Sequence, residues 1–273
     1  MKKLIVVADW AADTLTVQEV RSAVEGFLLD PAHPNISFIS TSPSTIHTSF
    51  ILAQLIEIEE RYGRPLDSVF FQNTDPRLDT TNPVEKSKGS ELMIIRLKSG
   101  IHILGPNAGY DFSLIKDKIE MVFTYPGLDV GSQFRSRDLY SRVAAHLMDS
   151  LEDDLELEEA HSNLIPEIEG SYIGHIDNYG NIKTTLKDDS VKETFRYGDE
   201  VNITINGTTK KALYAENLFS STPGNLILYP GSSGPKENPY LEISSWADFG
   251  ADTIKTGVSF FDDLTPGMKI EIR

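Results

Sequence analysis

Two aspartates in the first third of the chain lie just beyond hydrophobic runs. Asp9 directly follows the apolar run 4–8, and Asp75 closely follows the run 69–72, ahead of a proline that forces a turn. In open α/β sheets, ligands bind beyond the carboxyl ends of the strands. A single loop carboxylate usually faces water. Two of them at strand ends favour a site that binds a ligand or accepts a proton.

A second polar stretch, Gln133–Asp138, combines two arginines and an acid just before a predicted helix. Arg135 could bring positive charge to the same edge of the sheet, where the Gly-rich turn 105–109 is also expected. Ser136 or Asp138 could instead accept hydrogen bonds from the free N–H groups of the first helical turn. Helix capping and ligand binding both fit this stretch, because one residue can do both.

A third polar segment, Asp177–Asn181, lies between two short apolar runs. Its composition is typical of a tight turn, but it could also contact a ligand. The sequence contains no Walker A loop, GxGxxG, GxSxG or HExxH motif, and its six histidines are not paired at ligand spacing. We therefore predict neither a bound metal nor a cofactor.

The first half of the chain alternates strand-like and helix-like segments. They are expected in the order strand 4–8, helix 17–27, strand 36–39, helix 48–62 and strand 69–72. This order implies parallel strands joined by right-handed crossovers. Ser99-Gly100 then predicts a hairpin, and a third helix begins near residue 137. We expect an N-terminal α/β/α domain with a mostly parallel central sheet.

The second half consists of short, often alternating apolar runs punctuated by Gly and Asn. Asn206-Gly207 is a strong hairpin signal, and the pattern predicts a small all-β, barrel-like domain. The acidic run Glu152–Glu159 is interpreted as a solvated helix end followed by a linker. The predicted domains are therefore an α/β domain over residues 1–160 and a β-barrel over residues 168–273.

The net charge, the length of the apolar runs and the absence of cysteine limit the kinds of partner and compartment that we expect. The formal charge of −16 argues against nonspecific binding to nucleic acid or to anionic membranes and suits a cationic or zwitterionic small ligand. No apolar run has the roughly eighteen residues that a membrane helix needs. The chain has no cysteine, so disulfides and thiolate chemistry are excluded and a cytoplasmic location is expected.

In the order of its motifs the chain resembles the adenosine-forming S-adenosylmethionine hydrolases, also called SAM hydroxide adenosyltransferases, and their relatives the fluorinase and chlorinase. The likeness covers nearly the whole length and rests on Asp9, Thr74-Asp75-Pro76, Gly105–Gly109, Phe134–Asp138, Ala144–Leu147 and Asp177–Asn181. It implies an α/β domain followed by a small barrel. It also implies a homotrimer in which the ligand lies between one subunit's α/β domain and its neighbour's barrel.

The resemblance also implies roles for individual residues. Asp9, with Trp10 beside it, corresponds to the aspartate that holds the ribose hydroxyls, and Asp75 to the aspartate of an Asp-Arg-His set around the attacking water. Ser136 matches the serine that contacts halide in the fluorinase. The segment Asp177–Asn181, with Tyr179 and Asn181, corresponds to the part of the barrel that holds the methionine end. Ser233 belongs to a loop that contacts adenine.

The chain departs from the family pattern around the water. The family arginine falls on Asn82 and the family histidine on Arg135, so Asp75 alone is retained from the set. We therefore expect hydrolysis of S-adenosylmethionine at C5′ to adenosine and methionine, with Asp75 and Arg135 at an altered water site. The alternative is a non-catalytic or differently directed protein that binds nucleosides or other small ligands. A metal-dependent phosphoryl transfer through Asp9, Asp75 and Asp79 is a third, more distant interpretation.

Overall fold

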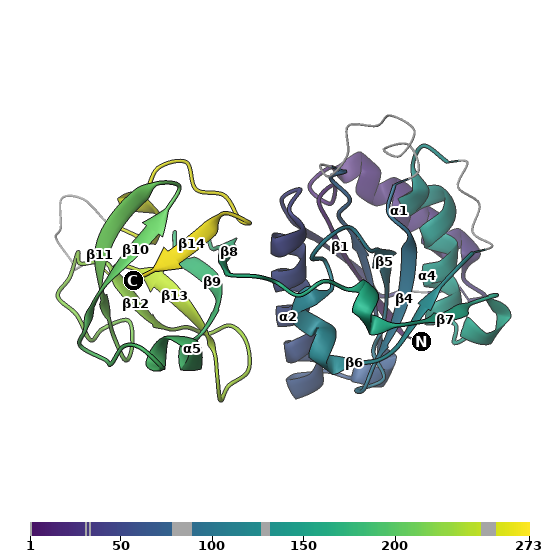
Figure 1. Cartoon of the computed structure of the whole chain (residues 1–273). Coiled ribbons are helices and arrows are strands. Elements are labelled where there is room, and N and C mark those ends of the chain that lie inside the picture. Colours follow the sequence, from purple (N-terminus) through teal and green to yellow (C-terminus); the bar gives the residue numbers. More distant parts are fainter. Residues whose placement is uncertain (1, 31, 33, 78–88, 127–131, 247–254) are drawn as a thin grey trace. The chain divides into compact units, whose positions relative to one another are not determined.

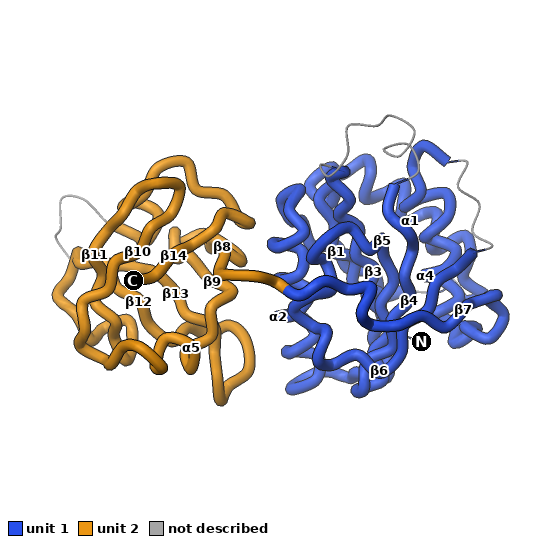
Figure 2. The backbone as a smooth tube through the Cα atoms, viewed as in Figure 1, with its two compact units in different colours: residues 1–167 blue, residues 168–273 orange. Residues whose placement is uncertain are grey.

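The computed structural model describes residues 2–30, 32, 34–77, 89–126, 132–246 and 255–273. The chain divides into two compact units, residues 1–167 and 168–273, which are blue and orange in Figure 2. Each unit has its own hydrophobic core, so each is described by itself. Within the described ranges, no helix is long and apolar enough to cross a membrane.

The first unit is built on a seven-stranded sheet with the strand order β2-β1-β3-β5-β4-β6-β7 (Figure 1). Strands β2, β1, β3 and β5 are parallel, whereas β4 is antiparallel to both of its neighbours and β7 is antiparallel to β6. The parallel half therefore presents its carboxyl ends at one edge. The strands are β1 Lys3–Ala8, β2 Ile36–Ser40, β3 Ser68–Asn73, β4 Leu92–Leu97, β5 His102–Pro106, β6 Ile119–Thr124 and β7 Glu158–Ala160.

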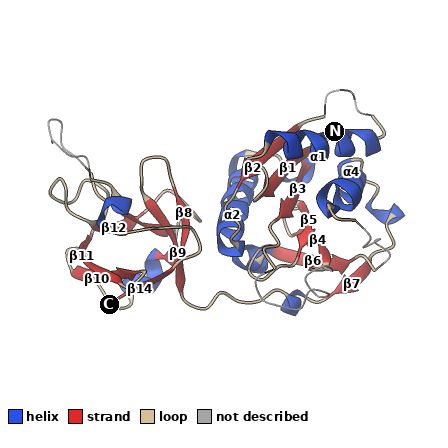
Figure 3. Ribbon diagram, turned by 90° about the horizontal axis from the view of Figure 1, so that it is seen from above, coloured by secondary structure: helices blue, strands red, loops and turns tan. Residues whose placement is uncertain are grey.

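Helices cover both faces of this sheet. Alternate residues of a strand point to opposite faces, and β1 divides accordingly: Leu4, Val6 and Ala8 pack with helices α1 and α4, whereas Ile5 and Val7 pack with α2. Figure 3 shows α2 on one side of the sheet and α1 and α4 on the other. This arrangement confirms the predicted α/β/α class. The helices are α1 Thr14–Phe27, α2 Thr45–Tyr62 and α4 Ser141–Met148, the short 3-10 helices η1 Pro65–Asp67, η2 Ser113–Lys118, η4 Glu152–Asp154 and η5 Ser162–Leu164, and the π-helical turn η3 Ser136–Tyr140.

The acidic run Glu152–Glu159 is not the solvated helix end and linker that its charge indicated. Glu158–Ala160 forms β7, the edge strand that pairs with β6, while Leu155 and Leu157 pack into the core of the first unit. Charged side chains suit an edge strand, because they face water and discourage further pairing. The run therefore belongs to the first unit, which extends to residue 167.

The second unit is a closed barrel with the strand order β10-β11-β12-β13-β9-β8-β14, as the sequence predicted. Asn206 and Gly207 connect β10 and β11 with φ values of 48° and 74°, the left-handed conformations that a two-residue hairpin turn requires. The elements are β8 Ser171–Ile176, β9 Ile182–Lys187, α5 Asp188–Lys192, β10 Glu200–Ile205, β11 Thr208–Tyr214, β12 Ile227–Pro230, β13 Tyr240–Ser244, η6 Gly257–Phe260 and β14 Lys269–Ile272.

Candidate functional site

Asp9 and Asp75 lie at the same edge of the first unit's sheet. Ala8, the last residue of β1, is in register with Asn73, the last residue of β3, and the Asp9 N–H donates to the Asn73 carbonyl at 3.4 Å. Burial raises the pKa of the Asp9 carboxyl, and the negative charge of Asp75 raises it further. The two aspartates that the sequence singled out are therefore electrostatic neighbours.

Asp75 and Arg135 form a buried ion pair. Arg135 Nη2 lies 3.3 Å from Asp75 Oδ2, and the two side chains are only 11% and 8% exposed. The more exposed Arg77 approaches the same oxygen with its Nε at 3.4 Å. The acid and the cation that the sequence nominated for the water site are thus in direct contact.

Ser90 connects both members of this pair, although no sequence pattern singled it out. Its N–H donates to Asp75 Oδ2 at 2.9 Å, and its hydroxyl donates to Oδ1 at 3.2 Å. Its carbonyl accepts from Arg135 Nη1 at 3.0 Å. The preceding Gly89 has a φ of 63°, and a Cβ there would lie 2.2 Å from Arg135 Nη2. Gly89-Ser90 therefore lies against the ion pair, and the left-handed φ of Gly89 favours glycine there.

The hydrogen bonds of Asp75 leave one acceptor position. Within the described ranges, Oδ2 receives three donors, from the Ser90 N–H, Arg135 and Arg77, whereas Oδ1 receives only the Ser90 hydroxyl. A carboxylate offers about four lone-pair sites, two on each oxygen. Oδ1 can therefore still accept a hydrogen bond from water, with Arg135 beside it to orient that water.

Arg135 reaches Asp75 from the start of the segment that leads into α4. Its guanidinium carbon lies 5.3 Å from the centre of the Tyr140 ring, within cation–π range. Burial is the main cause that raises the pKa of Tyr140, to about 12, so this phenol stays neutral at physiological pH. Ser136, directly after Arg135, is 3% exposed, and its carbonyl accepts from the Ser141 hydroxyl at 2.8 Å.

The predicted capping role of Ser136 or Asp138 is wrong. The π-helical turn η3 has no hydrogen bond from a side-chain cap. Asp138 instead binds Arg137 at 2.5 Å and the Ser132 hydroxyl at 2.5 Å. Asp138 binds Arg137 instead of the backbone N–H groups, because a charged donor binds a carboxylate more strongly than a neutral donor does.

Trp10 closes one flank of this edge with aromatic packing. Its ring meets Phe134 edge-on at 6.0 Å between centroids and lies 6.3 Å from Phe38. Its Nε1–H is buried and has no hydrogen-bond partner among the described residues. Because Phe134 precedes Arg135 in the chain, Trp10 also links Asp9 to the segment that carries the arginine.

A layer of buried polar side chains lies beneath Asp75. The hydroxyls of Thr41, Thr48 and Thr74 are 2.7–3.4 Å from one another. The Gln72 amide accepts from the Thr74 N–H at 2.9 Å and donates to the Pro106 carbonyl at 2.6 Å, which joins the ends of β3 and β5. These bonds fix the turn that carries Asp75.

In the second unit, Asp177 binds within its own turn. Its carboxylate accepts from the N–H groups of Tyr179 and Asn181 at 2.9 and 3.0 Å and from the Asn181 side chain at 3.0 Å. Asn181 in turn accepts from the Ser244 hydroxyl. Tyr179 is 81% exposed at the tip of the turn. The turn chemistry expected for this segment is therefore present, and Tyr179 is the side chain it offers to the outside.

Ser233 belongs to a loop that a buried acid holds in place. Glu242 is 4% exposed and accepts from Lys183 at 2.7 Å, from the Tyr229 hydroxyl at 3.0 Å and from the Ser232 N–H at 3.0 Å. Ser233 itself is buried, and its carbonyl accepts from the Tyr240 N–H at 2.8 Å. Lys183 follows Asn181 by two positions, so this network connects the two barrel segments that the sequence nominated.

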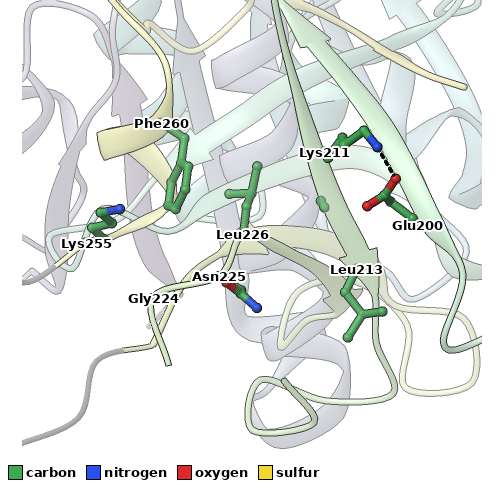
Figure 4. Close-up of a pocket in the computed structure, with 9 residues that line it drawn as sticks. Glu200, Lys211, Leu213, Gly224, Asn225, Leu226, Lys255 and Phe260 are labelled. Carbon is green, nitrogen blue, oxygen red and sulfur yellow. Dashed lines mark hydrogen bonds and ion pairs between the residues drawn. The ribbon is translucent and has the colours of Figure 1, made fainter. Parts of the chain in front are cut away.

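A hollow of about 510 Å³ also opens in the second unit, but it includes none of the nominated residues (Figure 4). Lys211 pairs with Glu200 at its rim, and Lys255 lies 5.6 Å from the centre of the Phe260 ring. The described part of the chain holds no group of three His, Cys, Asp or Glu residues that could bind a metal ion. Asp79, which the metal-dependent interpretation invokes, and Asn82, where the family arginine falls, lie outside the described residues.

The α/β/α unit with an acid–arginine pair at its carboxyl edge, together with a closed β-barrel, defines a two-domain class of protein. Two solved structures share this fold: an uncharacterized conserved protein from Thermotoga maritima, with a TM-score of 0.70, 17% identity and coverage of 99% of this chain and 100% of that one; and a conserved hypothetical protein from Thermus thermophilus, with a TM-score of 0.62, 16% identity and full coverage of both chains, 100% each.

Sequence comparison finds similarity to one family of proteins. Residues 171–244 match the model of the SAM hydroxide adenosyltransferase C-terminal domain. The (R)-S-adenosyl-L-methionine hydrolase of Methanocaldococcus jannaschii is 27% identical over 199 residues, which cover 66% of this chain and 68% of that protein. These matches support a divergent relationship to the S-adenosylmethionine hydrolase and SAM hydroxide adenosyltransferase superfamily, as the motif order indicated.

Proposed function

We propose that this protein hydrolyses S-adenosyl-L-methionine at C5′ and produces adenosine and L-methionine. The observation that carries the proposal is the buried contact between Asp75 and Arg135 at the carboxyl edge of the sheet. A similar protein from Methanocaldococcus jannaschii is named as a hydrolase of this substrate. The absence of cysteine keeps the cytoplasm as the proposed compartment.

The main requirement of this hydrolysis is a correctly oriented water nucleophile. The sulfonium leaves as a neutral thioether, so the leaving group needs no proton, and water must be held in line with the breaking C5′–S bond. In this proposal the open lone pair of Asp75 Oδ1 accepts the proton of that water. Arg135 orients the water and stabilises developing hydroxide, but it stays protonated and cannot shuttle a proton.

The proposed substrate contacts follow the resemblance. Asp9 holds the ribose hydroxyls, and Trp10 and Ser136 line the same edge of the sheet. In the barrel, Asp177, Tyr179 and Asn181 hold the methionine end, and Ser233 contacts adenine. We propose a homotrimer in which the barrel of one subunit completes the site of another. Sedimentation of the purified protein as a monomer under assay conditions would contradict this assembly.

The proposal is tested by incubating the protein with S-adenosylmethionine and quantifying adenosine and methionine by chromatography. Asp75→Asn should slow their formation by about 10²- to 10⁴-fold. Asp67→Asn is a matched control, because Asp67 is an exposed aspartate at the opposite end of the same strand and should leave the activity unchanged. Folded native protein that forms no adenosine above background would overturn the proposal.

A second function, ligand binding without turnover, is favoured by one feature of the site. Asp75 already receives two arginine side chains and two donors from Ser90, and positive charge beside a sulfonium opposes binding of that cation. A neutral nucleoside would not suffer this repulsion. This alternative predicts thermal stabilisation by adenosine without chemical change. Melting curves that do not respond to adenosine or to S-adenosylmethionine would exclude it.

A further inference from the structure

Ser90 is placed at the carboxyl edge of the first unit's sheet by contacts that do not involve Asp75. It lies just before β4, which is antiparallel to β5, so the start of β4 meets the end of β5 at this edge. Directly after β5, the Asn107 N–H donates to the Glu91 carbonyl at 2.9 Å. The sheet therefore positions Ser90 independently of its contacts with the carboxylate.

Among the described residues, Ser90 alone donates to one of the two oxygens of Asp75. Both arginines and the Ser90 N–H bind Oδ2, whereas the Ser90 hydroxyl donates to Oδ1 at 3.2 Å. The terminal torsion of an aspartate is broad, so a carboxylate that is held at one oxygen can still turn about that oxygen. Two donors on two oxygens, both from one residue, remove this freedom.

The same residue also holds the cation of the site. The Ser90 carbonyl accepts from Arg135 Nη1 at 3.0 Å, while Arg135 Nη2 lies 3.3 Å from Asp75 Oδ2. A guanidinium is planar and rigid, so its two nitrogens bind two partners whose relative position Ser90 sets through its own N–H. The orientation of the acid and the place of the arginine therefore depend on one residue.

We propose that Ser90 is a positioning residue for hydrolysis, whose hydroxyl aims the open lone pair of Asp75 Oδ1 at the attacking water. This inference rests on the proposed function, in which that lone pair accepts the proton of the water. In that step a C5′–O bond forms, the C5′–S bond breaks with its electron pair on sulfur, and the water proton passes to Oδ1. The Ser90 hydroxyl keeps its own proton throughout, so Ser90 acts only through Asp75.

Positioning and base strength predict opposite effects of this hydroxyl. A donor on Oδ1 stabilises its negative charge and makes that oxygen a weaker proton acceptor. Removal of the hydroxyl would therefore speed the reaction if base strength limited it. If the direction of the lone pair limits the reaction, the same change slows it, because small errors in the geometry of reacting groups cost large factors in rate. The sign of the change in kcat separates the two.

Ser90→Ala removes the hydroxyl but keeps the backbone N–H and carbonyl that bind Asp75 and Arg135. With S-adenosylmethionine as substrate, kcat should fall about 10- to 100-fold while KM changes by less than about twofold. Ser90→Thr keeps a hydroxyl and should retain most of the native kcat. Ser68→Ala is the matched control, because Ser68, at the opposite end of β3, donates its hydroxyl to the Glu59 carboxylate at 3.1 Å. It should leave both constants unchanged.

A kcat of Ser90→Ala that equals or exceeds the native value would overturn the inference, as would an equal loss of kcat in Ser90→Thr. Crystal structures of the native protein and of Ser90→Ala test it without an activity measurement. The Asp75 carboxylate should turn about its Cβ–Cγ bond in the variant, and an unchanged orientation would overturn the inference. If Ser90→Ala does not fold, Ser90→Cys, whose thiol is a weak donor, replaces it with the same expected results. Adenosine formation by the native protein decides the proposed function separately.

Discussion

Asp75 and Asp177 both lie in polar turns, but their carboxylates are bound by donors from different parts of the chain. Asp177 is bound by donors no more than four residues away, all within its own turn. Asp75 is bound by Ser90 and Arg135, which are 15 and 60 residues away in the chain. A carboxylate closed by its own turn stabilises that turn, whereas one held by distant groups joins separate elements. The comparison supports Asp75 as the centre of the proposed site, and it shows that Asp177 also stabilises the turn that carries Tyr179 and Asn181.

The largest predicted difference between Asp75 and Asp177 is in their contribution to catalysis. Asp75→Asn should lower kcat for adenosine formation by about 10²- to 10⁴-fold, the usual contribution of a general base. Asp177→Asn should mainly raise KM, because it weakens the proposed hold on the methionine end and loosens the turn that carries Tyr179 and Asn181. Steady-state kinetics on both variants provide the measurement. Similar losses of kcat in the two would show that the distinction is wrong.

The next effect is on stability. Arg135→Ala leaves Asp75 buried without its main counter-ion, so the free energy of unfolding should fall by about 3–5 kcal/mol. Arg77→Ala removes a 39% exposed partner of the same oxygen and should cost only about 0–1 kcal/mol. Denaturant titrations give both values. A small loss for Arg135→Ala would mean that the pair contributes little to holding these elements together.

Gly89 and Gly207 offer a matched pair of backbone substitutions. Both have left-handed φ values, 63° and 74°, but a Cβ at Gly89 would meet Arg135 Nη2 at 2.2 Å, whereas a Cβ at Gly207 would meet nothing within 4 Å. Each change to alanine should cost about 1–2 kcal/mol of stability from backbone strain. Only Gly89→Ala should also displace Arg135 and reduce adenosine formation. Equal activity of the two variants would argue against a tight crossing over the ion pair.

The smallest effect concerns pH. Burial, and then the charge of Asp75, raise the pKa of Asp9 above its ordinary value of 3.8. Folding therefore favours protonated Asp9, and the free energy of unfolding should fall as pH rises from about 3.8 through the folded pKa. Asp9→Asn removes this loss, so it should gain stability relative to the native protein across that window. A constant difference between the two proteins over this pH range would contradict the assignment.

Much of the fold could be predicted because its signals are local. Apolar periodicity indicated the sheet and helices of the first unit, and Asn206-Gly207 indicated a barrel hairpin with the required left-handed conformations. The acidic run before the second unit was misread, because the edge strand Glu158–Ala160 carries charges toward water instead of an apolar alternation.

The site was predictable only in part. Strand ends pointed to Asp9 and Asp75, and motif order pointed to Arg135. Ser90 carried no signal, because its importance comes from contacts that only the folded chain creates. Capping at Ser136 or Asp138 was a reasonable local expectation, but the neighbouring Arg137 binds Asp138 instead.

The central claim is that water, activated beside Asp75, attacks C5′ of S-adenosylmethionine. A single-turnover reaction in ¹⁸O-labelled water, followed by mass spectrometry of the products, tests it most directly. We predict one ¹⁸O atom in adenosine, at its 5′-oxygen, and unlabelled methionine, with the same product formed at least about 10²-fold more slowly by Asp75→Asn. Adenosine without the label, or the same labelled product formed equally fast by Asp75→Asn, would contradict it.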